Sequence, residues 1–342
     1  MKHKVCVVTV TYGDRFHLLK QVIDASLDEG VNKIIVVDNA SSENSRNQLK
    51  EYEKNLKDKL KVIYLDENIG SAGGYKRGLE EAYKCEDCEF IWLLDDDNKP
   101  ENNALKVLLD LWDSLDVENK EEKIALQAFR YKKNSHQLFN KLITIENKTN
   151  LNMDIKNSFI GFHIKELHKK VYRHAIKILG LERYASDNVH IKGNSNFGII
   201  PNAMFGGLLL HKNILKNIGY PNKELFLYFD DLDWSHRITK RGGKIYFILD
   251  SKIEDIDLSW DEHRETQFSL LGKGDPFKVY YFIRNRVFFE LNYLVDNKLV
   301  YLINLLVFLI LASLLSTKNI KIILKAIKDG YEGRLRKVNF LK

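Results

Sequence analysis

The stretch FIWLLDDDNKP, residues 90–100, joins a run of apolar and aromatic residues to three consecutive aspartates, Asp95, Asp96 and Asp97. A short apolar run of this kind predicts a buried strand. Adjacent carboxylates repel one another and burial of an unpaired charge is costly, so we expect positive charge beside the end of this strand. A divalent cation, Mg²⁺ or Mn²⁺, suits such oxygen ligands and would in turn hold a diphosphate. The alternative is an acidic helix N-terminus before Pro100.

The residues that precede this stretch alternate between apolar runs and amphipathic patterns. Further strands are predicted at 5–10, 33–39 and 60–66, and the segments between them have helical spacing of apolar residues. Continuous apolar strands that alternate with amphipathic helices predict an α/β fold with a doubly wound, mostly parallel sheet. Ligands of such sheets bind at the carboxyl ends of the strands.

Polar residues and glycines gather at these predicted strand ends and suggest a ligand with a base, a sugar and phosphates. They are Thr9, Thr11, Asp38, Asn39, Asn68, Gly70, Gly73, Gly74 and Asp95 to Asp97. The glycine-rich turn NIGSAGGYKRG, residues 68–78, lacks the spacing of a phosphate loop or a dinucleotide fingerprint. Its glycines permit close backbone approach, and Arg77 is a candidate partner for phosphate. The alternative is a plain glycine turn.

A second acidic cluster lies in LYFDDLDWSHR, residues 227–237, which holds Asp230, Asp231 and Asp233 between aromatic residues. A carboxylate beside an apolar wall can have a raised pKa and act as a general base. The alternative is a helix N-terminus with acids in its first turn. Both interpretations hold together if one aspartate caps the helix while another does chemistry.

The chain has 342 residues and a net charge of +6, which comes entirely from its last segment. Residues 316–342 contain eight basic and two acidic side chains, and the remainder is neutral. A basic face on the folded body, the usual mark of a nucleic-acid partner, is therefore not expected. The basic segment follows the apolar run 299–315, which predicts an anionic membrane surface as partner.

The apolar run 299–315 is at the lower limit for spanning a bilayer. Residues 318–330 then alternate lysines with isoleucines and leucines at helical spacing, as in a helix that lies in the membrane interface. We expect peripheral membrane association or a helix-mediated homo-oligomer contact; a true span and a buried helix are the alternatives. The N-terminal apolar run is too short for a signal sequence, and three cysteines suggest reduced thiols, so we expect a cytoplasmic protein.

Five motifs, in this order and spacing, carry a resemblance to a known family: VVTVTYGDR, VVDNAS, ENIGSAGGYKRGL, WLLDDD and YFDDLDWSHR. Together they resemble the inverting nucleotide-sugar glycosyltransferases of family 2, which have the GT-A fold. The resemblance covers residues 4 to 290. The motifs FDDLDW, DLSW and YYFIRNR look most like bacterial galactofuranosyltransferases and their rhamnosyltransferase relatives.

The resemblance implies a division of the chain. Residues 1–290 would form the glycosyltransferase domain, with a nucleotide-binding half at 1–130 and an acceptor-binding half at 131–290. Residues 291–342 would form an added C-terminal helical segment that associates with the membrane.

The resemblance also implies a role for each matching residue. Thr9 and Asp38 would hold the uracil and ribose, with Thr11 and Asn39 beside them. Asn68, Gly73 and Arg77 would line the nucleotide pocket. Asp95 and Asp97 would bind the metal and the donor diphosphate, with Asp96 between them. Gly206 and Gly207, in the stretch AMFGG, would border the donor sugar. Asp231 would be the catalytic base, and Asp230 and Asp233 would support it or bind the acceptor.

One departure from the family concerns the metal. The galactofuranosyltransferases place a histidine ligand shortly before the tryptophan that matches Trp260, and this sequence has none there. Asp255 is the expected substitute, with Asp257 and His263 as alternatives. Carboxylates suit both Mn²⁺ and Mg²⁺.

The expected function is inverting transfer of galactofuranose from its UDP donor to a growing, lipid-linked, cell-surface polysaccharide at the cytoplasmic face of the membrane. Rhamnose from a dTDP donor is the second expectation. A non-catalytic protein that binds a sugar nucleotide or glycan is an alternative from another class, although a binder has no use for a base such as Asp231. A nucleotidyltransferase is a further alternative. It would normally show a glycine-rich loop with a basic residue directly after the first strand, and the stretch TVTYGDRFHLL, residues 9–19, lacks such a loop.

Overall fold

The computed structural model describes residues 2–131, 156–166, 197–257, 274–315 and 319–338. These residues group into two compact units. The sheet unit contains the described residues of 2–131 and 197–257. The helical unit contains 156–166, 274–315 and 319–338. The sequence placed a boundary at residue 290, which falls within a helix of the helical unit, and the predicted domain limits stay a prediction.

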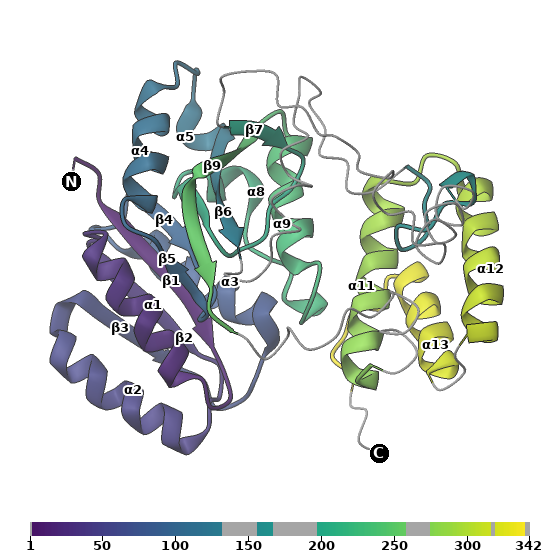
Figure 1. Ribbon diagram of the computed structural model, residues 1–342, viewed down its shortest axis with the longest axis horizontal. Helices are drawn as coiled ribbons and strands as arrows, with labels where there is room; N and C mark the ends of the chain where they lie inside the picture. Colours follow the sequence, from purple (N-terminus) through teal and green to yellow (C-terminus); the bar gives the residue numbers. More distant parts are fainter. Residues whose placement is uncertain (1, 132–155, 167–196, 258–273, 316–318, 339–342) are drawn as a thin grey trace, which may run out of the picture. The chain divides into compact units, whose positions relative to one another are not determined.

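The sheet unit is built on one mixed β-sheet with the strand order β3-β2-β1-β4-β8-β6-β9-β5, and β7 pairs with β9 (Figure 1). The strands are β1 (Val5–Thr11), β2 (Lys33–Asp38), β3 (Leu60–Tyr64), β4 (Phe90–Leu93), β5 (Asn98–Pro100), β6 (Ile124–Tyr131), β7 (Phe197–Ile200), β8 (Leu208–His211) and β9 (Lys244–Asp255). Strands β3, β2, β1 and β4 are parallel, as predicted. Beyond them β8 is antiparallel to β4 and β6, while β6 and β9 are parallel.

Helices cover both faces of this sheet, which makes it doubly wound. They are α1 (Phe16–Asp28), α2 (Glu43–Leu56), α3 (Gly70–Lys84), α4 (Ala104–Ser114), α5 (Lys120–Lys123), α8 (Ile214–Ile218) and α9 (Asp230–Lys240), with short 3-10 turns at Lys57–Lys59 and Lys223–Leu225. Val5 and Val7 of β1 belong to the core shared with α1 and α4. Val8 and Val10 face α3 on the other side, as the two-residue period of a strand requires.

Helix α3 lies unusually close to the sheet because its sheet-facing positions are glycines. A Cβ atom added at Gly78 would lie 2.4 Å from Val8 Cγ1, and one at Gly74 would lie 2.6 Å from Val10 Cγ1. No real side chain fits at such distances. The glycine-rich turn therefore serves helix–strand packing, which sets the position of the first turn of α3 beside the carboxyl end of β1.

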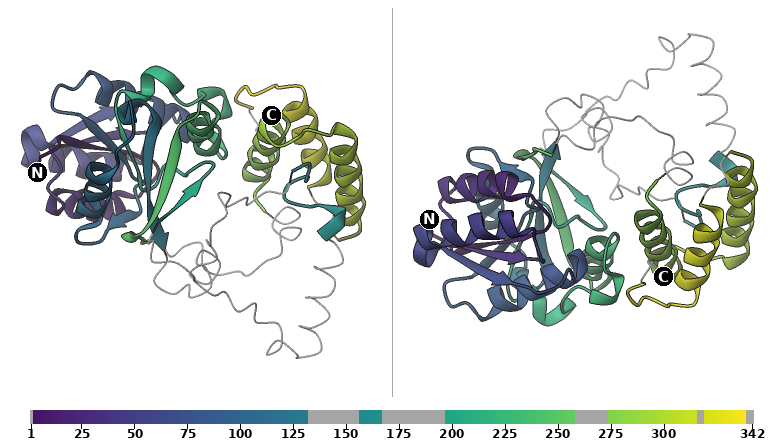
Figure 2. Two further views of the ribbon diagram at one scale, coloured as in Figure 1. Left: turned by 90° about the horizontal axis from the view of Figure 1, so that it is seen from above. Right: turned by 90° about the horizontal axis from the view of Figure 1, so that it is seen from below.

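The helical unit consists of α11 (Pro276–Tyr293), α12 (Lys298–Leu315) and α13 (Ile320–Tyr331), with a 3-10 turn at Ile164–Glu166 (Figure 2). Its interior holds the buried carboxylate of Glu290, which accepts hydrogen bonds from Tyr301 Oη at 3.0 Å and from the Ile160 amide at 2.9 Å. Arg284 is also buried, with its guanidinium 4.6 Å from the ring centroid of Tyr281.

The apolar run predicted at 299–315 forms most of α12. None of the described helices combines the length and the apolar character needed to cross a bilayer.

One motif of the family resemblance has a packing role. The motif YYFIRNR lies in α11, and its Arg284 is buried in the core of the helical unit.

We expect Gly78→Ala to lower the free energy of unfolding by about 1–3 kcal/mol, because the added methyl group overpacks the contact between α3 and β1. Urea unfolding followed by tryptophan fluorescence measures the change. Lys84→Ala, at the exposed end of the same helix, is the matched control and should change stability by less than about 0.5 kcal/mol. Equal stability of both variants would contradict the close approach.

Candidate functional site

The three aspartates follow β4 and turn directly into β5, which pairs with the end of β9. The register places Asn98 opposite Asp255, and the Ile256 amide donates to the Asp97 carbonyl oxygen at 2.9 Å. This pairing brings the carboxylates of residues 255 and 257 to the triple aspartate. It also excludes the alternative of a helix N-terminus before Pro100: residues 98–100 are held extended by β9, and α4 begins only at Ala104.

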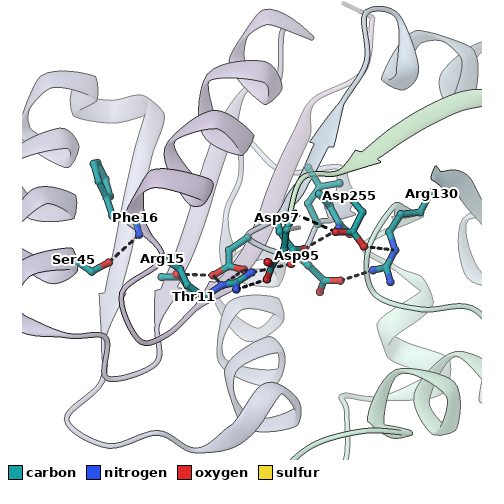
Figure 3. A network of polar contacts seen from close by, with 12 residues as sticks. Thr11, Arg15, Phe16, Ser45, Asp95, Asp97, Arg130 and Asp255 are labelled. Atoms are coloured by element: carbon teal, nitrogen blue, oxygen red, sulfur yellow. Dashed lines mark hydrogen bonds and ion pairs between the residues drawn. The ribbon is translucent and has the colours of Figure 1, made fainter. Parts of the chain in front are cut away.

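Arg15 provides the positive charge that the triple aspartate requires (Figure 3). It directly precedes α1, and its Nε donates to both carboxylate oxygens of Asp96 at 3.0 Å. Its Nη2 contacts Asp97 at 2.8 Å and its Nη1 contacts Asp257 at 2.7 Å. Thr11 Oγ1 donates to Asp96 at 2.8 Å. One guanidinium group therefore joins three carboxylates from two distant segments.

Asp95 points away from Arg15 to a second guanidinium group. Arg130, near the end of β6, donates from Nη1 to Asp95 at 3.0 Å, and its Nε lies 3.9 Å from Asp255 (Figure 3). Tyr75 of α3 donates its hydroxyl hydrogen to the other oxygen of Asp95 at 2.7 Å. Gly206 packs against the same group, since a Cβ there would lie 2.9 Å from Asp95 Oδ2 and 1.9 Å from Asn98 Oδ1.

Burial and mutual repulsion raise the pKa values of Asp96 and Asp97, which disfavours the fully ionised form of this cluster. Burial raises the pKa of Asp97 to about 7, and the negative charges of Asp95, Asp96 and Asp255 add to the effect. Burial also raises the pKa of Asp96, against the opposing influence of Arg15. Additional positive charge at Asp97 would thus be stabilising.

The predicted metal ligands fit a hard divalent cation by their chemistry, because Asp95, Asp97 and Asp255 offer carboxylate oxygens side by side. Within the described residues, however, no three histidine, cysteine, aspartate or glutamate side chains form a ready metal-binding cluster. Asp97 and the alternative ligand Asp257 are both held by Arg15. The alternative ligand His263 lies outside the described residues.

The second acidic cluster forms the first turn of α9, after a segment of strained backbone. Phe226, Tyr228 and Phe229 all have positive φ angles of 61 to 66°, which is uncommon for residues with a bulky side chain. Such strain persists only where the surrounding structure enforces it. The turn delivers Asp230 and Asp231 to the start of the helix, so the expected helix terminus is present.

Asp230 and Asp231 have different environments. Asp230 is 2% exposed and accepts a hydrogen bond from Ser71 Oγ, in the first turn of α3. Burial and then the charge of Asp231 raise the pKa of Asp230 to about 8. Burial raises the pKa of Asp231 to about 6. The hydrogen bond from the Leu232 amide lowers this pKa, the negative charge of Asp95 raises it, and the positive charge of Arg130 lowers it. Asp231 therefore lies within electrostatic reach of the first acidic cluster.

Asp233 has its ion-pair partner on its own helix, α9. It is buried and forms an ion pair with Arg237, one turn further along α9. The structure thus gives Asp233 a role in holding the helix, and its expected contribution to acceptor binding stays a prediction.

Several residues predicted to bind the nucleotide lie together at the carboxyl ends of β1 and β2. Asp38 is buried and pairs with Arg46 Nε at 2.5 Å. The Asn39 side chain donates to Asn68 Oδ1 at 3.2 Å and accepts from the Ile69 amide at 2.9 Å. Thr9 Oγ1 is buried and has no hydrogen-bond partner among the described residues.

The remaining predicted residues differ in position. Gly73 packs against Ile69, and Gly207, with φ of +95°, donates its amide hydrogen to the Leu93 carbonyl at 2.8 Å. Arg77 lies on the exposed side of α3 and pairs with Glu80 at 3.3 Å. No contact joins Arg77 to the carboxylate clusters within the described residues, and its role at the nucleotide stays a prediction.

Four side chains of the site were not predicted from the sequence: Arg15, Arg130, Tyr75 and Ser71. Arg15 lies four residues after the end of β1, within the motif VVTVTYGDR, and Arg130 is the second-last residue of β6, which is mostly apolar. The available signal for both arginines was their position near the end of a strand, since the triple aspartate also follows a strand end and needs positive charge. Ser71 and Tyr75 are one turn apart on α3, so they share a face of this helix.

Comparison with known proteins agrees with this geometry. Residues 6–175 match the family model described as glycosyl transferase family 2. This part of the chain, about half of its length, is therefore similar to a family 2 glycosyltransferase domain.

The chain is 30% identical over 111 residues to the putative teichuronic acid biosynthesis glycosyltransferase TuaG of Bacillus subtilis (strain 168). The match covers 32% of this chain and 42% of TuaG, so it spans less than half of that relative.

Among solved structures, GalNAc-T7 with UDP, GalNAc and Mn²⁺ is similar, with a TM-score of 0.54 at 13% identity over 84% of this chain and 47% of that one. This likeness establishes a GT-A-like fold. TarS 1–349 of S. aureus in complex with UDP aligns with a TM-score of 0.47 at 14% identity, over 96% of this chain and 92% of that one.

We expect Arg15→Gln to lower the free energy of unfolding by about 3–5 kcal/mol at neutral pH, because the buried carboxylate of Asp96 would lose its counter-charge. Urea unfolding measures this loss. Lys54→Gln, exposed on α2, is the matched control and should be nearly neutral.

The double variant Arg15→Gln/Asp96→Asn tests the cause of the loss. It should be more stable than Arg15→Gln alone, since the unpaired buried charge has been removed. A double variant as unstable as the sum of both single variants would show that Arg15 acts by packing and not by charge.

Proposed function

We propose that this protein is an inverting, metal-dependent glycosyltransferase that moves a sugar from a nucleotide donor to a hydroxyl group of a growing, lipid-linked, cell-surface polysaccharide. The observation that carries the proposal is the electrostatic proximity of Asp231 to Asp95 and Arg130. A candidate base and a candidate diphosphate site thus share one end of the sheet, within a fold of the GT-A type.

On the donor side, Asp95 and Asp97, with Asp255 beside them, would hold Mn²⁺ or Mg²⁺, which when bound neutralises the charge of a leaving diphosphate. Arg15 keeps Asp96 and Asp97 in place. Arg130 fixes Asp95 and adds positive charge on the side of Asp255. The buried polar groups of Thr9, Asp38 and Asn39 would receive the base and ribose.

On the acceptor side, Asp231 would accept the hydroxyl proton as the oxygen attacks the anomeric carbon. A pKa of about 6 leaves this carboxylate ionised at neutral pH yet basic enough to take a proton. Asp230, whose pKa of about 8 keeps it protonated, adds no second negative charge and is bonded to Ser71. A single attack opposite the leaving group inverts the anomeric centre.

Galactofuranose from a UDP donor is the sugar we propose first, and rhamnose from a dTDP donor is the second. The motifs FDDLDW, DLSW and YYFIRNR support this order. TuaG is named for teichuronic acid biosynthesis, which supports a polysaccharide of the cell surface as acceptor. The GalNAc-T7 structure contains Mn²⁺ and UDP; for this chain we infer the cation from the carboxylate ligands.

Purified protein should release nucleotide from one sugar nucleotide of a panel when Mn²⁺ or Mg²⁺ is present, and chelator should abolish this release. Asp97→Ala should remove both turnover and metal-dependent donor binding, because it deletes a proposed ligand of the cation. Calorimetric titration of donor into the same samples reports binding even if hydrolysis without acceptor is slow. Asp113→Ala, a remote surface acid, is the matched control.

The panel also separates the rival functions. Turnover of UDP-galactofuranose or of dTDP-rhamnose names the donor. Donor binding without turnover in the presence of acceptor would favour a non-catalytic binding protein. Donor binding that ignores both metal and Asp97→Ala would refute the proposed role of the triple aspartate.

The second-order rate constant for acceptor should rise with pH to a plateau, with a midpoint near 6, because Asp231 must lose its proton before it can act as a base. Asp231→Asn should lower the rate by about 10² to 10⁴ and remove this limb. A pH series with saturating donor and cation measures both. Asp113→Asn should keep the limb, and a limb near 6 that persists in Asp231→Asn would exclude Asp231 as its origin.

A further inference from the structure

Helix α12 has an apolar outer face as well as an apolar inner face. Tyr301, Asn304 and Phe308 are buried on the inner side, where Phe308 packs edge-on against Phe159 at 5.0 Å between ring centroids. The outer side carries large apolar residues that remain exposed. They are Leu299 (68%), Leu302 (41%), Ile303 (42%), Leu306 (58%) and Ile310 (60%).

From Leu299 the stripe continues to the adjacent pair Leu302 and Ile303, then to Leu306 and Ile310, with steps of three to four residues that keep it on one face of the helix. A surface helix of a water-exposed domain normally places charged residues on that side. In α12 the first residue, Lys298, is the only charged one. A contiguous apolar face of this kind marks a binding surface.

The rest of the helical unit is strongly basic on its exposed surface. On α13, Lys321, Lys325 and Lys328 are exposed, and Leu324 and Tyr331 are exposed among them. The segment 316–342 holds all the net positive charge of the chain. At the start of α12, a pocket of about 370 Å³ is lined by Lys165 and by Lys156, which is paired with Asp296 at 3.3 Å.

We infer that the helical unit docks on an anionic phospholipid bilayer, with the outer face of α12 entering the interfacial layer and the lysines of α13 contacting lipid phosphates. Charge decides between the possible occupants of the face. A second copy of this chain would bring the same positive segment against its own, whereas an anionic bilayer offers both apolar depth and opposite charge.

This docking does not rest on the proposed transferase activity, since it needs neither donor nor acceptor. It deepens that proposal in one respect, because a protein held at the bilayer surface is close to a lipid-linked acceptor. A vesicle-binding experiment without substrates therefore tests the docking alone.

The experiment is co-sedimentation of the full chain with phosphatidylcholine vesicles that contain or lack phosphatidylglycerol. We expect binding to the anionic vesicles, weakened by added salt. Leu306→Gln/Ile310→Gln should weaken the partition constant at least about tenfold, because both side chains enter the interface. Lys321→Gln and Lys328→Gln should each weaken it about fivefold.

Matched controls come from the sheet unit. Phe197→Gln removes an exposed apolar side chain of β7, and Lys54→Gln and Lys59→Gln remove exposed charges; all three should bind vesicles like the unchanged protein. Equal thermal midpoints for the variants exclude unfolding as the cause.

Three results would overturn the inference. One is vesicle binding that Leu306→Gln/Ile310→Gln leaves unchanged, and another is no vesicle binding by the unchanged chain. The third is a dimer in sedimentation velocity that this double variant dissociates while vesicles bind neither protein, which would assign the face of α12 to a second copy.

Discussion

The guanidinium group of Arg15 is the interaction on which the rest of the site depends. Its carboxylate partners lie 81 to 242 residues further along the chain, so one side chain fixes the end of β4 against the segment that follows β9. Like charges cannot be gathered in a low-dielectric interior without such a counter-charge. The pairing of β5 with β9 sets the register of these carboxylates, and Arg15 makes their proximity tolerable.

The environment gives two neighbouring carboxylates, Asp230 and Asp231, different pKa values. Asp230 is enclosed and bonded to Ser71, and it holds its proton at neutral pH. Asp231 is half-buried and senses both Asp95 and Arg130, and it ionises at a lower pH. Adjacent residues with pKa values driven apart by their surroundings are the usual arrangement of an acid–base site. Here the strained turn at Phe226 to Phe229 creates the difference by presenting the two side chains to different surroundings.

The sequence was sufficient to predict the parallel half of the sheet, since short apolar runs that alternate with amphipathic segments are typical of buried parallel strands. It also located both acidic clusters, because the residues stand at strand and helix ends. The alternative of a helix N-terminus before Pro100 fails, because pairing with a strand more than 150 residues away overrides the local helix signal. Arg15 and Arg130 escaped prediction for a related reason: a single basic residue has no periodicity, and its role is defined only by partners brought together by the fold. Arg77, in contrast, stood in a promising motif but pairs with its neighbour Glu80.

The close packing of helix α3 against β1 also affects how the two acidic clusters can influence one another. Ser71 bonds to Asp230 and Tyr75 bonds to Asp95, so two successive turns of one helix each support one of the acidic clusters. The glycines at 74 and 78 leave this helix little room to move independently of β1. A ligand that displaces α3 on one side must therefore alter the free energy of binding on the other. Thermodynamic linkage makes that influence mutual: if the proposed donor changes the affinity for the proposed acceptor by some factor, the acceptor changes the affinity for the donor by the same factor.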